Sequence, residues 1–133
     1  MSLLEVSGLS VVYRGDRGVP VEAVSGADLS VAAGQIVALV GESGCGKSSL
    51  GKAAVGLVTP SAGSVRFEGR PLTPLGRGAR PASERKLQMV FQDPFSSLNP
   101  RRRIGDLIAE GAQVAGAAAM SVAQCLGHVG LDA

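Results

Sequence analysis

The sequence has 133 residues, a length that suits a single domain with a buried core. Its formal net charge is only +2, so no global field points to nucleic acid or to an anionic membrane. With 19 glycines, three Phe, one Tyr and no Trp, the core must be built from Val, Leu, Ile and Ala. The two cysteines make no disulfide framework, which fits a reducing compartment.

Extended segments and turns alternate in the first part of the chain. Hydrophobic residues from Leu4 to Tyr13 predict one or two strands, and the turn-rich stretch Arg14 to Pro20 predicts a loop. Ala23 to Val31 is the next predicted strand, closed by a turn at Ala33-Gly34. Residues 35–40 (QIVALV) are apolar on both faces, which indicates a central strand covered on both sides.

The second half changes from this mixed pattern to a helical one. A helix is expected from Lys47 to about Leu57, a short strand from Ser64 to Glu68, a surface loop from Gly69 to Pro81 and a buried strand at 86–91 (KLQMVF). Beyond residue 93, helices are predicted by apolar residues at helical spacing: Ile104, Leu107, Ile108, Val122, Cys125, Leu126 and Val129.

No membrane span is expected from the uncharged stretch between Gly111 and Leu131. The stretch is mostly Gly and Ala, contains two glutamines and a histidine, and has few large apolar residues. The histidine, His128, is expected in the last turn of a helix, where its charge suits the helix dipole.

The stretch GESGCGKSSL, from Gly41 to Leu50, matches the phosphate-binding pattern G-x-x-x-x-G-K-S between a predicted strand and a predicted helix. Glycines let successive backbone N–H groups approach phosphate oxygens, and the helix adds its positive N-terminal end. Lys47 would reach the β- and γ-phosphates, and the Ser48 hydroxyl would bind Mg²⁺. The loop alone leaves kinases, GTPases and transport ATPases open.

A second stretch of sequence indicates which class of nucleotide-binding protein this is. MVFQDPFSSLNPRRRIGDLIAEG, from Met89 to Gly111, taken with VALVGESGCGKSSL, closely resembles ATP-binding subunits of ABC transporters, particularly the dipeptide and oligopeptide importer branch. The resemblance covers essentially the whole chain. It implies an α/β P-loop NTPase fold of the ABC ATPase type, of which the chain would be roughly the N-terminal half: a partial nucleotide-binding core at 1–92 and the beginning of a helical subdomain at 93–133.

The resemblance also implies a set of site residues for ATP and Mg²⁺. Tyr13 would stack on adenine, and Gln92 would contact Mg²⁺ and the attacking water and couple the site to the transmembrane subunits. Lys47 and Gln92 would be the catalytic residues, and Ser48 and Gln92 the metal ligands. The phosphates would be bound by the loop and the first residues of the helix: Gly41, Glu42, Ser43, Gly44, Cys45, Gly46, Lys47, Ser48 and Ser49.

By the same resemblance, the partners would be transmembrane permease subunits and a second ATPase subunit, at the cytoplasmic face of the cell membrane. Simpler interpretations stay open: Tyr13 as a strand-end residue, Gln92 as a solvated loop residue, and residues 101–103 (RRR) as a solvated flank. No aromatic residues interleave with this arginine run, so nucleic acid is not expected as a partner.

Three motifs that the family pattern requires for turnover do not occur in the sequence: the LSGGQ signature, an apolar strand ending in Asp-Glu, and the switch histidine. None of the five aspartates precedes a Glu, and His128 does not match the switch position. We therefore expect the 133-residue chain not to hydrolyse ATP alone. The alternative function is a non-hydrolysing nucleotide-binding fragment, or a half that needs a complementary chain; a small-molecule kinase is a more distant third.

Overall fold

The computed structural model falls into two compact units, residues 1–87 and residues 88–133, each of which is described by itself. The predicted division into a nucleotide core at 1–92 and a helical subdomain at 93–133 stays a prediction. The structure describes residues 2–15, 18–76, 80–93, 97–115 and 120–131.

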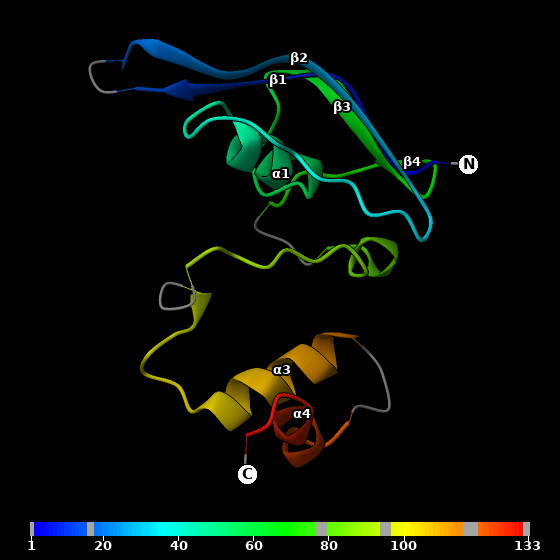
Figure 1. Ribbon diagram of the computed structural model, residues 1–133, viewed down its shortest axis with the longest axis vertical. Coiled ribbons are helices and arrows are strands. Elements are labelled where there is room, and N and C mark those ends of the chain that lie inside the picture. The colour runs from blue at the N-terminus through cyan, green and yellow to red at the C-terminus, as the bar shows by residue number, and fades with distance from the viewer. Residues whose placement is uncertain (1, 16–17, 77–79, 94–96, 116–119, 132–133) are drawn as a thin grey trace. The chain divides into compact units, whose positions relative to one another are not determined.

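The first unit is built on a four-stranded antiparallel sheet with the strand order β2-β1-β3-β4 (Figure 1). Its long hairpin consists of β1 (Ser2–Arg14) and β2 (Pro20–Ala32), and β3 (Ala62–Phe67) and β4 (Arg70–Pro71) follow later in the chain. These strands confirm the extended segments predicted before residue 32 and at 64–68. The loop predicted at 69–81 begins with the two residues of β4, and residues 77–79 lie outside the described part of the chain.

A β-bulge in β1 turns its apolar residues toward one face. Val6 pairs with Leu29 and Leu9 with Ala27, so β1 carries one extra residue at this point. Gly8 adopts a φ of 55°, the left-handed backbone that such a bulge requires. Because of this extra residue, Val6 and Leu9 are both buried although they lie three positions apart.

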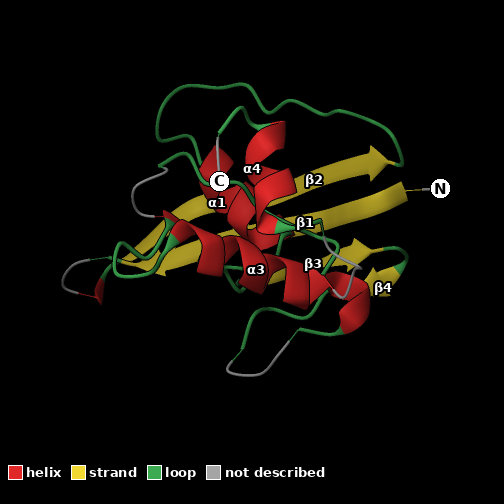
Figure 2. Ribbon diagram, turned by 90° about the horizontal axis from the view of Figure 1, so that it is seen from below, coloured by secondary structure: helices red, strands yellow, loops and turns green. Residues whose placement is uncertain are grey.

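Within the first unit, helix α1 (Lys47–Ala54) lies against one face of the sheet and contacts β1 and β2 (Figure 1; the strands are yellow in Figure 2). The helix ends a few residues before the predicted Leu57, and it buries Ala53 and Ala54. Among the described residues, the buried hydrophobic side chains are aliphatic except for Phe67, which agrees with the composition. The small side chains of Ala53 and Ala54 let the helix approach the strands closely. The buried core residues are Val6, Leu9, Val11, Ala53, Ala54 and Val65.

A hydrogen bond from Arg80 anchors the C-terminal end of α1. Arg80 donates from its guanidinium to the carbonyl of Val55 directly after the helix, which satisfies one of the open carbonyls there. Arg80 is paired at 3.7 Å with Glu84, in the 3₁₀ turn η2 (Ala82–Glu84). Glu84 is only 8% exposed and accepts a hydrogen bond from the N–H of Thr73. Thr73, Arg80 and Glu84 are therefore linked to the end of the helix.

The second unit contains α3 (Ile104–Ala115) and α4 (Val122–His128), which contact each other and confirm the two helices predicted beyond residue 93. Ser121 and Gln124 form a capping box at the start of α4. His128 occupies the last turn of α4, as the sequence predicts. None of the helices in the described part of the chain is both long and apolar enough to cross a membrane.

Two predicted strands are wrong. Residues 35–40 and 86–91 are extended or irregular and pair with no described strand. Ile36 is 96% exposed and Val90 95%, where the sequence predicts buried side chains. A strand that is apolar on both faces forms only between neighbours on both edges, and the described sheet offers these segments none.

Candidate phosphate-binding site

The glycine loop lies between the extended segment 35–40 and the start of α1. Gly44 and Gly46 have φ angles of 83° and 91°, in the left-handed region that favours glycine. Gly46 is also pressed against β2, since a Cβ added to it would lie 2.1 Å from the carbonyl oxygen of Ala23. The spacing of glycines in the motif thus has a steric cause: at position 46 the backbone itself must touch the neighbouring strand.

The first amides of α1 are free to bind a ligand. Gly46 caps the helix without a side-chain hydrogen bond, and the first turn contains no acidic residue. The first helical bond runs from the N–H of Leu50 to the carbonyl of Gly46 at 2.8 Å. Within the described part of the chain, the N–H groups of Lys47, Ser48 and Ser49 have no acceptor. Unpaired donors and the positive end of a helix suit a bound anion.

The Lys47 side chain folds back over the loop. Its Nζ donates to the carbonyl of Gly41 at 2.7 Å, to the carbonyl of Glu42, and to Sγ of Cys45 at 3.3 Å. These contacts hold a cation at the mouth of the loop. A phosphate ligand would draw at least one of the three ammonium hydrogens away from these acceptors.

The thiol of Cys45 lies at the mouth of the loop, beside the Lys47 ammonium group. Its sulfur contacts Nζ of Lys47 and lies 2.7 Å from the position that a Cβ on Gly41 would take. Cys45 is exposed, while Cys125 in α4 is half-buried.

Tyr13 lies beside the start of α1. Its hydroxyl donates to Oγ of Ser49 at 3.3 Å, and Ser48 is exposed next to it. The structure therefore brings Tyr13 together with the predicted phosphate residues, although the chain separates Tyr13 and Ser49 by 36 positions. Gln92 is an exposed residue of the second unit, and its predicted role stays a prediction. The sequence does not predict the hydrogen bond between Tyr13 and Ser49, because no local sequence pattern indicates it.

In the described residues no three or more His, Cys, Asp or Glu side chains gather in a way that could hold a metal ion. Mg²⁺ commonly takes one or two protein oxygens together with phosphate oxygens and water. Ser48 is exposed at the start of α1, and its predicted role as a magnesium ligand stays a prediction.

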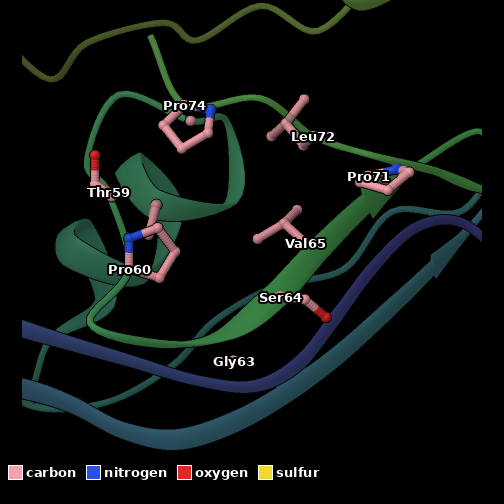
Figure 3. A pocket seen from close by; sticks show the side chains of 10 residues that line it. Thr59, Pro60, Gly63, Ser64, Val65, Pro71, Leu72 and Pro74 are labelled. Carbon is pink, nitrogen blue, oxygen red and sulfur yellow. The ribbon is translucent and has the colours of Figure 1, made fainter. Parts of the chain in front are cut away.

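A separate cavity of about 280 Å³ lies at the opposite end of α1 (Figure 3). Ala53 and Gly56 line it from the helix side, Val65 from β3 and Leu72 from the segment that follows β4. None of its lining residues carries a charge, so it offers no cation for a phosphate. The candidate site is the loop, not this cavity.

A glycine loop that joins an extended segment to a helix beneath a mixed α/β unit defines the P-loop class. The sequence profile of the ABC transporter family matches residues 24–133, and the chain belongs to that family. A solved nucleotide-free ATP-binding cassette from an ABC transporter has the same fold, with a TM-score of 0.56 at 22% identity over 86% of this chain and 47% of its own.

Two curated relatives align over 114 residues. An oligopeptide transport ATP-binding protein of Bacillus subtilis is 42% identical over 86% of this chain and 35% of its own length. The nickel import ATP-binding protein NikE of Escherichia coli K12 is 41% identical over 83% of this chain and 42% of its own. The chain thus spans well under half of the length of these relatives.

The packing of Gly46 generates a first prediction. In Gly46→Ala the added methyl group meets the carbonyl of Ala23 in a backbone conformation that L-residues avoid, so we expect a loss of at least about 2 kcal/mol of stability. Urea unfolding followed by the fluorescence of Tyr13, the one tyrosine in a chain without tryptophan, measures it. Gly76→Ala, which meets no atom within 4 Å, is the matched control; equal midpoints for both variants would contradict the packing argument.

The position of Cys45 generates a second prediction. A maleimide should label exposed Cys45 faster than half-buried Cys125, and MgATP should protect Cys45 because a nucleotide at Lys47 covers the sulfur. Mass spectrometry of the labelled peptides, with and without MgATP, measures both rates. Protection of both cysteines, or of neither, would argue against a nucleotide at this loop.

Proposed function

We propose that the loop Gly41–Ser48 binds ATP together with Mg²⁺, as part of an ABC transporter ATPase subunit. One observation carries the proposal: the free amides at the start of α1 lie beside the Lys47 side chain, which the loop carbonyls hold at the mouth of the loop. A triphosphate presents several anionic oxygens in a row, which suits a row of backbone donors followed by one mobile cation.

Each residue has a separate task in this proposal. The amides from Gly44 to Ser49 bind the phosphate oxygens, and Lys47 turns from the loop carbonyls toward the β- and γ-phosphates. Ser48 binds the metal ion, which neutralises charge that develops on the phosphates. Tyr13 offers its ring to the base, and Gln92 orients the water and transmits the state of the site to the transmembrane subunits.

As a whole protein, we propose, this subunit energises the import of peptides or a similar solute. The names of the relatives support an importer, since one is named for oligopeptide transport and the other for nickel import. The partners would be permease subunits and a second ATPase subunit, which places the protein at the cytoplasmic face of the membrane.

The exposed apolar segments favour a second candidate, a nucleotide-binding half that needs a complementary chain. Ile36 and Val40 are almost fully exposed in the segment that leads into the loop, and Val90 is exposed in the segment before Gln92. Exposed apolar segments of this kind tend to pair with the strands of another chain. In this alternative, the chain binds the nucleotide first, and hydrolysis begins only after a complementary chain has completed its sheet.

The proposal is tested by Lys47→Ala. Loss of the one directed cation should weaken ATP binding by about 1.5–3 kcal/mol, more than tenfold in affinity. Titration calorimetry with MgATP measures the change. Lys52→Ala removes the same charge from the last turn of α1, away from the loop, and should change ATP affinity less than twofold. Equal ATP affinity in wild type and Lys47→Ala would refute the assignment of the loop.

A further expectation concerns turnover by the 133-residue chain itself. No Asp-Glu pair follows an apolar strand in its sequence, so no carboxylate is expected to polarise the attacking water. Phosphate release from MgATP, assayed on a monodisperse preparation, should stay at background. Release that persists through purification and disappears in Lys47→Ala would show that the chain hydrolyses ATP without a partner.

A further inference from the structure

Tyr13 and Ser49 form a hydroxyl pair that links the hairpin to the helix. The Tyr13 hydroxyl, near the end of β1, donates to Oγ of Ser49 in the first turn of α1 at 3.3 Å. The tyrosine is still 38% exposed, so part of its ring stays open to a ligand while its hydroxyl end is held. A tyrosine side chain has only two rotatable bonds, so one such contact restricts most of its motion.

A second, independent contact joins the same two elements. Gly46 lies against the carbonyl of Ala23 in β2, two residues beyond Val21, the β2 residue that pairs with Tyr13. The loop touches one strand of the hairpin, and the helix holds a side chain of the other. The aromatic ring and the free amides of α1 are therefore both linked to the same hairpin.

We infer that Ser49 is a positioning residue that sets the distance between the Tyr13 ring and the phosphate-binding amides. This inference rests on the proposed nucleotide function of the loop. A ring held in place before binding has less freedom to lose when a base packs against it. The pair thus favours a triphosphate that carries a base at the matching distance over a bare polyphosphate of the same charge.

The test compares two ligands, MgATP and magnesium tripolyphosphate, by titration calorimetry on the full 133-residue chain. Tyr13→Phe and Ser49→Ala each remove one hydroxyl, and each should weaken ATP binding about two- to tenfold, the usual size of one neutral hydrogen bond. Because tripolyphosphate has no base, its dissociation constant should stay the same. The ratio of the ATP constant to the tripolyphosphate constant should therefore rise by the same factor. The double variant should be no weaker than either single variant, because both remove the same bond.

Two further variants separate positioning from general damage. Ser49→Thr keeps a hydroxyl and should restore ATP affinity to within about twofold of wild type. Ser30→Ala removes another hydroxyl pair, Ser2 with Ser30 at 3.0 Å, at the opposite end of the hairpin, and should leave the ratio unchanged.

Each remaining outcome overturns the inference in a recognisable way. If Ser49→Ala weakens the binding of tripolyphosphate as much as the binding of ATP, the Ser49 hydroxyl contributes to phosphate binding and does not position the ring. If the effects of Tyr13→Phe and Ser49→Ala add, the two hydroxyls act separately. If the wild-type chain binds neither ligand, the proposed function fails together with the inference, whereas the other two outcomes leave ATP binding intact.

Discussion

The contact between Gly46 and the carbonyl of Ala23 is the constraint on which the rest of the site depends. At this point the loop backbone lies so close to β2 that no side chain fits, and the left-handed φ of Gly46 turns the chain directly into α1. The direction of the helix follows, and with it the direction in which its first amides point. Arg80 holds the other end of the helix at Val55, so α1 is fixed at both of its ends.

The loop is organised before any ligand binds. Lys47 supplies the positive charge that the loop carbonyls attract, and this contact closes the loop around its own cation. The N–H groups of Lys47, Ser48 and Ser49 stay unpaired among the described residues, at an end of the helix that water reaches. Exposed donors lose little free energy while water solvates them, and an anion replaces that water without a rearrangement of the backbone.

The sequence predicts most of the first unit, since its signals are local. The strands up to residue 32, the strand at 62–67 and helix α1 follow from hydrophobic periodicity and turn residues. The same reasoning fails at 35–40 and 86–91, where the pattern is that of a buried central strand. Periodicity shows which faces of a segment are apolar, but pairing requires neighbours, and the chain spans well under half of the length of its relatives.

By itself, the sequence determined the phosphate loop, because the required chemistry lies in consecutive residues: glycines that free the amides, one lysine and one serine hydroxyl. Tertiary structure alone decided what surrounds that loop. The contact of Gly46 with Ala23, the hydroxyl pair of Tyr13 and Ser49, and the turn of the Cys45 thiol toward Lys47 are set by packing and not by the motif. The first two join residues far apart in the chain, and their distances exist only once the hairpin and helix have packed together.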